Sequence, residues 1–136
     1  MINKILLSIN ILMTTTFNLP VEILDFFELK ENTTVFCSEN VDEKIEQALF
    51  PYIDNKKKEY DVVLFAGFEE LEPKALQLKA GGKGIMIAPY GTQAQACQTL
   101  KQLGMKIVHK EMHRELGSLD EIKRVHLIFF EKRLDP

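Results

Sequence analysis

Segments typical of buried β-strands alternate with segments typical of amphipathic helices along most of this chain. Apolar residues recur at helical spacing between successive strand-like segments as far as residue 104. Such alternation predicts parallel strands joined by right-handed crossovers, with helices on both faces of one sheet. The strand-like segments are 5–13, 33–38, 61–67, 84–88, 105–112 and 125–130.

The connection between the last two strand-like segments lacks this helical pattern. Residues 115–123 are mostly polar, so the final two strands are expected to pair antiparallel. The predicted fold is a three-layer α/β domain over residues 1–136, with a mostly parallel sheet that ends in an antiparallel strand pair. A flavodoxin-like domain such as a signalling receiver is a weaker alternative. It would have five parallel strands, and it is disfavoured because no acidic pocket follows the first strand-like segment.

Two capping-box patterns predict helix starts. Asn40 is followed three residues later by Glu43, and Thr92 is followed in the same way by Gln95. In this motif the two side chains each bond a free backbone N–H of the first helical turn. We therefore expect one helix to begin at Asn40 and another at Thr92.

All seven glycines lie at Gly67 or later in the chain. Gly81 and Gly82 are expected to end a helix over 71–79 by adopting positive φ, and Gly104 is expected to end the next helix. The first half has no glycine, which excludes the commonest loops that cradle phosphates or cofactors there.

The composition is that of an ordinary globular protein. The chain has 136 residues and a net charge of −3. The mild acidity argues against a dedicated nucleic-acid binder, and no apolar run reaches the ~18–20 residues of a membrane span. Cys37 and Cys97 match no metal spacing, as expected of reduced thiols. We expect a cytoplasmic protein with no nucleic-acid or membrane partner, and an N-terminal strand rather than a signal peptide.

The second half resembles the class I S-adenosylmethionine-dependent methyltransferases. Residues 60–67 (YDVVLFAG) are similar to the family's fourth strand, and residues 76–89 (LQLKAGGKGIMIAP) to its Gly-Gly turn and fifth strand. Residues 100–112 (LKQLGMKIVHKEM) are similar to its helix, glycine and sixth strand, and residues 125–132 (VHLIFFEK) to its seventh. The resemblance implies a methyltransferase-like, Rossmann-like fold.

The first half departs from that family where its cofactor binds. The family binds S-adenosylmethionine on a glycine-rich turn after its first strand, and residues 11–17 (ILMTTTF) contain no glycine. Residues 66–70 (AGFEE) replace the family's Asn-Pro-Pro-Tyr catalytic turn, and one βα unit is missing. If S-adenosylmethionine binds, the resemblance implies Glu39 as the acidic residue on its ribose and Gly67 on a second contacting turn.

A methyltransferase-like fold without a cofactor loop resembles the N-terminal domain of the anamorsin family of cytosolic iron–sulfur assembly factors. The similar segments are NLPVEILDFF (18–27), EYDVVLFAG (59–67), the Gly81-Gly82 turn and KEMHRELGSLDEI (110–122). The family's cysteine-rich tail is absent. The resemblance implies a non-catalytic protein-interaction module, without a cofactor or catalytic residues, in iron–sulfur cluster assembly. The alternative is a minimal S-adenosylmethionine-dependent methyltransferase with an atypical cofactor site.

Four residues are expected at the edge where a partner or ligand would bind. Glu69, Glu70 and Glu72 follow one predicted strand, and Tyr90 follows the next. Open α/β sheets bind ligands outside the carboxyl ends of their strands, which is where these residues should lie. Helix capping is the alternative role for the glutamates.

The histidines allow a metal site but do not require one. His109, Glu111, His113 and Glu115 alternate and would share one face of a strand, in a pattern that suits Zn²⁺. A solvated face near the edge of a sheet has the same pattern. We adopt that interpretation and predict no metal site, and we take His126 as a structural histidine.

Overall fold

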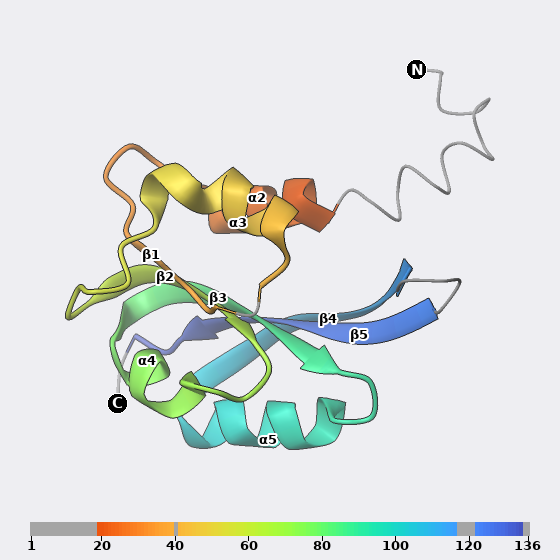
Figure 1. Cartoon of the computed structure of the whole chain (residues 1–136). Helices are drawn as coiled ribbons and strands as arrows, with labels where there is room; N and C mark the ends of the chain where they lie inside the picture. The colour runs from red at the N-terminus through yellow and green to blue at the C-terminus, as the bar shows by residue number, and fades with distance from the viewer. Residues whose placement is uncertain (1–18, 40, 117–121, 135–136) are drawn as a thin grey trace.

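The computed structural model describes residues 19–39, 41–116 and 122–134. Its central element is a five-stranded sheet in the order β1-β2-β3-β5-β4 (Figure 1). β1, β2 and β3 are parallel, whereas β5 lies between β3 and β4 and is antiparallel to both. The strands are β1 (Val35–Cys37), β2 (Tyr60–Ala66), β3 (Leu78–Pro89), β4 (Met105–Leu116) and β5 (Ile122–Lys132).

This topology confirms a mostly parallel sheet with an antiparallel strand pair at one edge. The receiver-like alternative is wrong, because it requires five parallel strands without such a pair. The strand predicted over residues 5–13 lies outside the described residues.

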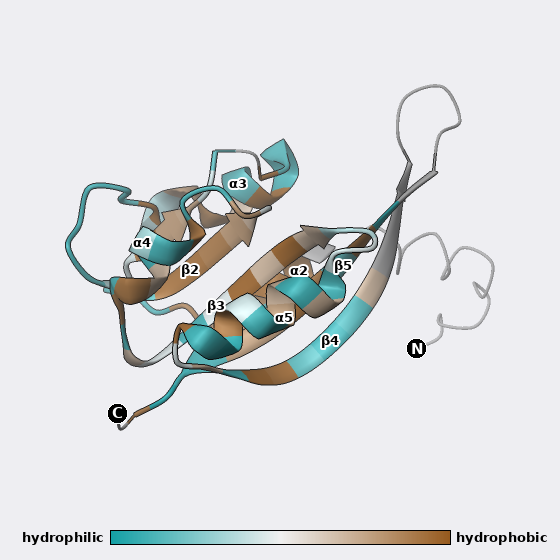
Figure 2. Cartoon of the chain, turned by 90° about the horizontal axis from the view of Figure 1, so that it is seen from below, coloured by the Kyte–Doolittle hydropathy of each residue, from teal (hydrophilic) through white to brown (hydrophobic). Residues whose placement is uncertain are grey.

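Helices cover both faces of the sheet, as the alternation predicts. α2 (Leu19–Phe27) and α3 (Glu43–Leu49) lie on one face, and a 3₁₀ turn, η1 (Phe50–Tyr52), follows α3. α4 (Leu71–Leu76) and α5 (Gln93–Gln102) lie on the other face (Figure 1). In Figure 2 the hydrophobic colour is concentrated on β2 and β3, whereas much of β4 and of the outer surface of α5 is hydrophilic.

Alternate residues of β2 enter two separate apolar clusters. Val62 and Leu64 pack in the cluster under α2 and α3, whereas Val63 and Phe65 pack in the cluster with α4 and α5. This is the period of two expected of a strand, and both faces are apolar because both are covered. Burial of both faces of β2 therefore explains the continuous apolar run that predicted a buried strand there.

The outer edge of β1 is covered by a segment that follows η1. Ile53 forms a single parallel bridge with Val35, and the N–H of Asp54 donates to the Val35 carbonyl at 3.0 Å. The Asn55 amide oxygen accepts from the Cys37 N–H (3.1 Å), and the Asn55 amide nitrogen donates to the Cys37 carbonyl (3.0 Å). One side chain thus bonds the backbone groups that a further strand would otherwise pair, which protects this edge.

The capping boxes predict one helix start correctly and place the other too early. α3 begins at Glu43 with Asp42 as its N-cap, two residues after Asn40, because the N–H of Val41 first closes a turn on the Ser38 carbonyl. Thr92 is the N-cap of α5, as predicted. Its hydroxyl donates to the Pro89 carbonyl (2.7 Å) rather than accepting from the helix, so no capping box forms there.

The glycine pair Gly81-Gly82 belongs to a strand and not to a helix end. α4 stops at Leu76, and Leu78 already pairs with Tyr60 as the first residue of β3. The register then shifts, and Gly81 accommodates the irregularity with a φ of +82°. The predicted helix over 71–79 is therefore too long, since Leu78 is buried by strand pairing. Gly104 does follow α5 with a φ of +87°, as predicted.

β4 and β5 are both longer than predicted. They pair with each other through Leu116 and Ile122, beyond Pro89 and Val125, where the pairing of β3 with β5 ends. The hairpin therefore projects past the rest of the sheet (Figures 1 and 2). None of the described helices has both the length and the hydrophobicity that crossing a membrane requires.

Candidate functional site at the carboxyl edge of the sheet

The carboxyl ends of β1, β2 and β3 meet at one edge of the sheet, which we call the carboxyl edge. It carries residues 38, 39, 41 and 42 and the turns 67–70 and 90–92, which follow these strands. Ligands of open α/β sheets bind at this edge. Every site residue predicted from the sequence lies on these turns or in the first helical turn after them: Glu39, Gly67, Glu69, Glu70, Glu72 and Tyr90.

The turn after β1 uses its backbone donors inside the chain. The N–H of Ser38 donates to the Leu64 carbonyl (3.0 Å), and the N–H of Val41 donates to the Ser38 carbonyl (3.3 Å). The side chain of Asp42 caps the first turn of α3. Ser38 is buried, so only Glu39 presents an exposed polar side chain from the segment between β1 and residue 40.

The turn after β2 starts with an open position at Gly67. Its φ is +85°, a conformation that favours glycine, and its N–H donates to the Ile87 carbonyl at 2.9 Å. A Cβ added there would meet no atom within 4 Å. Because β1 and β2 are neighbours, the turns of Glu39 and Gly67 are adjacent at the carboxyl edge.

The three glutamates after β2 are all exposed. Glu70 occupies the N-cap position of α4 with a φ of +60°, and no side chain bonds to the helix there. Glu72 lies in the first turn of α4, where the partial positive charge of the helix end favours a carboxylate. Helix capping was the alternative role for these glutamates. At the start of α4, Glu72 contributes its charge, whereas the Glu70 side chain makes no capping hydrogen bond.

Tyr90 lies beside two residues of β5. Its ring stacks on the His126 ring, with centroids 5.7 Å apart and an interplanar angle of 11°. The Arg124 guanidinium carbon lies 5.6 Å from the Tyr90 centroid, within cation–π range. Tyr90 is still 58% exposed.

Sequence reasoning selected Tyr90 but missed Arg124, and it treated His126 only as structural. The two β5 residues are separated by one position, so period-two alternation alone would have placed them on one face. Their placement beside Tyr90 required the antiparallel register of β3 with β5, in which Pro89 pairs with Val125.

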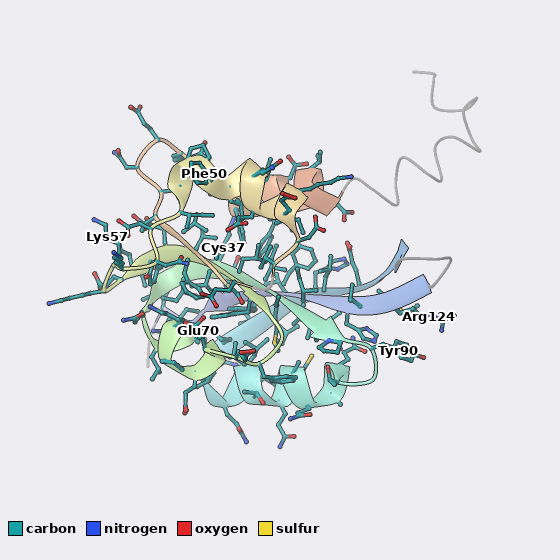
Figure 3. All side chains as sticks on the ribbon, viewed as in Figure 1. Cys37, Phe50, Lys57, Glu70, Tyr90 and Arg124 are labelled. Atoms are coloured by element: carbon teal, nitrogen blue, oxygen red, sulfur yellow. The ribbon has the colours of Figure 1, made fainter. Side chains whose placement is uncertain are left out.

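The predicted site residues do not form one cluster. Figure 3 shows Tyr90 and Arg124 together near the start of β5, whereas Glu70 lies apart from them at the start of α4. The carboxyl edge therefore has an acidic part around Glu70 and a basic and aromatic part around Tyr90.

Of the alternating histidines and glutamates of β4, His109 and Glu111 share one face in the observed register, whereas the side chains of His113 and Glu115 lie outside the described part of the chain. His109 Nε2 lies 2.8 Å from Glu111 Oε2, and the His109 ring packs against Phe129. In the described part of the chain, no group of three histidine, cysteine or carboxylate side chains is placed to hold a metal ion.

A groove at the opposite edge of the sheet was not predicted from the sequence. Lys83 lies in it and donates to Glu28 at 2.6 Å and to the Phe26 carbonyl at 3.0 Å. The Lys83 ammonium holds the pKa of the Glu28 carboxyl below its usual value, mainly through this hydrogen bond. The groove is lined by Phe27, Glu28, Lys30, Glu31, Asn32, Thr33, Asp61, Val62, Gly81 and Lys83.

No protein-family model and no curated protein matches this sequence. Solved structures do match. A precorrin-6Y C5,15-methyltransferase from Geobacter metallireducens aligns with 85% of this chain and 88% of its own, at 12% identity and a TM-score of 0.56. A SAM-dependent methyltransferase from Methanosarcina mazei aligns with 83% of this chain and 98% of its own, at 8% identity and a TM-score of 0.57.

The chain has a class I methyltransferase-like fold. A precorrin-8w decarboxylase from Methanobacterium thermoautotrophicum is also similar, at 16% identity and a TM-score of 0.53 over 83% of this chain and 89% of its own. Identities this low show the fold alone, and one fold hosts different reactions. The likeness to anamorsin is not shown by these comparisons and stays a prediction.

Residues 11–17, where the family's glycine-rich cofactor turn would lie, are outside the described residues. A glycine-type cradle needs backbone that a ligand can approach closely. The turn after β1 is the one that carries Glu39, and there the N–H groups of Ser38 and Val41 are bonded within the chain, while Asp42 occupies the start of α3. Only Glu39 and the open turn at Gly67 match what the resemblance implies for S-adenosylmethionine.

Proposed function

We propose that this chain keeps a methyltransferase-like fold without transferring methyl groups, and that it binds a protein partner through the carboxyl edge of its sheet. The observation that supports this proposal most strongly is the absence of glycine from residues 11–17, where the family's cofactor-binding turn would lie. In the turn after β1, which carries Glu39, the N–H groups of Ser38 and Val41 are already hydrogen-bonded within the chain. A ligand that displaced such a buried bond would have to offset about 1–3 kcal/mol.

A second candidate is a minimal S-adenosylmethionine-dependent methyltransferase. The names of the similar structures favour it, and so does the open space over Gly67 next to the Glu39 turn. In this case the Glu39 carboxylate would accept hydrogen bonds from the ribose hydroxyls. No residue of the chain is assigned to the transfer step.

Isothermal titration calorimetry with S-adenosylmethionine and S-adenosylhomocysteine separates the two candidates. The non-catalytic proposal predicts no saturable heat for either ligand up to about 1 mM. A dissociation constant below about 100 μM, roughly −5.5 kcal/mol, contradicts it. If that binding is lost in Glu39→Gln and kept in Glu43→Gln, a matched exposed glutamate of α3, the second candidate is supported.

Cytosolic iron–sulfur assembly is the cellular setting that we propose. It is supported by the sequence resemblance to the anamorsin domain. A reading frame that adds a cysteine-rich segment after residue 136 would support this setting.

A further inference from the structure

One face of the β4–β5 hairpin carries cations among its described side chains. In the observed register Lys110 pairs with Ile128 and Met112 with His126, and Arg124 lies two residues from His126 on the same face of β5. Tyr90 joins them through its contacts with Arg124 and His126. We call this surface the basic face and define it by Tyr90, Lys110, Met112, Arg124 and His126.

Glu111 of β4 lies on the other side. It alternates with the basic-face positions and shares the face of His109. Among the described residues no carboxylate forms an ion pair with Arg124. The described side chains of Lys110 and Arg124 therefore place positive charge on one face of a chain whose net charge is −3.

The basic face also exposes apolar surface. Tyr90 is 58% exposed and Met112 is 51% exposed. Tyrosine, methionine and arginine are enriched in the cores of protein interfaces relative to the rest of the surface. The hairpin projects past β3, so a partner can reach this surface (Figures 1 and 3).

We propose that the basic face binds an acidic segment of the protein partner. This inference rests on the proposed function and names the chemistry of its partner. Carboxylates of the segment would lie on Arg124 and Lys110, while an apolar part of it covers Tyr90 and Met112. A nucleic acid is disfavoured because the chain is acidic overall and because Glu69, Glu70 and Glu72 lie at the same edge of the sheet.

Fluorescence anisotropy with fluorescein-labelled octaglutamate tests this inference at low ionic strength. We expect saturable binding that weakens about tenfold or more in Arg124→Glu and less in Arg124→Lys, which keeps the charge. Lys57→Glu is the matched control, because Lys57 is exposed on the loop before β2, far from Tyr90 (Figure 3). Its affinity should stay within about twofold of the parent chain. Circular dichroism checks that each variant is folded.

Three outcomes overturn the inference. They are no saturable binding up to about 1 mM, equal losses in Arg124→Glu and Lys57→Glu, and tighter binding of an octathymidylate than of octaglutamate. The calorimetry with S-adenosylmethionine is a separate readout. If both octaglutamate and S-adenosylmethionine bind, the non-catalytic role is contradicted and the inference about the basic face is supported. If neither binds, the inference about the basic face is contradicted and the non-catalytic role is supported.

Discussion

At the residue scale, Gly84 shows how tightly the sheet packs against its own side chains. It lies in β3, and an added Cβ would meet the ring of Phe130 and a methyl group of Val63. We predict that Gly84→Ala lowers the free energy of unfolding by about 1–3 kcal/mol, since a well-packed core accommodates extra atoms only by shifting its neighbours. Urea denaturation measures this loss.

A double variant provides the control for Gly84→Ala. Phe130→Leu removes the ring that the new Cβ would meet, so the double variant should lose less stability than the sum of the two single variants. If the stability losses of the two single variants simply add in the double variant, a clash with Phe130 is not the cause of the loss in Gly84→Ala.

Cys37 is predicted to be the unreactive thiol of the two. Burial raises the pKa of the Cys37 thiol from its ordinary value of 9.0 to about 12, and the Glu46 carboxylate adds to the shift. The folded chain thus keeps a proton that the unfolded chain loses between pH 9 and 12, so this group lowers stability as the pH rises through that range.

Labelling with a disulfide reagent at pH 8 tests the Cys37 prediction, because the thiolate is the reactive form. In Cys97→Ser, we expect labelling only as fast as the protein unfolds. In Cys37→Ser, the half-buried Cys97 should react faster. Rapid labelling of Cys37 in the folded protein would contradict the burial on which the prediction rests.

The position of a candidate site residue could be predicted only where the residue directly follows a strand in the sequence. Glu39, Gly67 and Tyr90 do lie at the carboxyl edge, because each directly follows a recognisable strand. Arg124 could not be found in this way, since its place beside Tyr90 depends on the pairing of β3 with β5.

At the scale of elements, Asn55 takes the place of a strand along the outer edge of β1. Its amide bonds both backbone groups of Cys37 at 3.0–3.1 Å. Asn55→Ala should lower the free energy of unfolding by about 1–3 kcal/mol, because those groups lose their partner. It should also speed amide hydrogen exchange at Cys37.

Asn32→Ala is the matched control for Asn55→Ala. Asn32 is an exposed asparagine in the connection between α2 and β1, and its removal should change stability by about 0.5 kcal/mol or less. Equal effects of the two variants would contradict the edge-covering role of Asn55.

The type and order of most described elements followed from the sequence, whereas several of their ends did not. The apolar run at β2 and the spacing in α5 are set by burial, which residue type reports well. The end of α4 is set by the pairing of Leu78 with Tyr60, a contact between segments that local signals do not contain. The same reason explains why Gly81 serves a strand irregularity and not a helix end.

At the scale of the whole molecule, the comparisons show the fold, whereas the non-catalytic function is our proposal. The methyltransferase-like fold is clear from the solved structures, although identities are 8–16% for the three named. The carboxyl edge has Glu39 and the open turn at Gly67, whereas residues 11–17, where the family's cofactor turn would lie, contain no glycine. The charges of this edge are divided between an acidic part at Glu70 and the basic face around Arg124, an arrangement that suits a protein surface as partner.

The absence of a working cofactor cradle is the central claim, and NMR tests it at the residues concerned. Nitrogen–proton correlation spectra would be recorded while S-adenosylhomocysteine is added up to about 1 mM. We predict that the amide signals of Glu39 and Gly67 do not shift. Saturable shifts of both signals would contradict the claim and indicate a cofactor bound between the turns after β1 and β2.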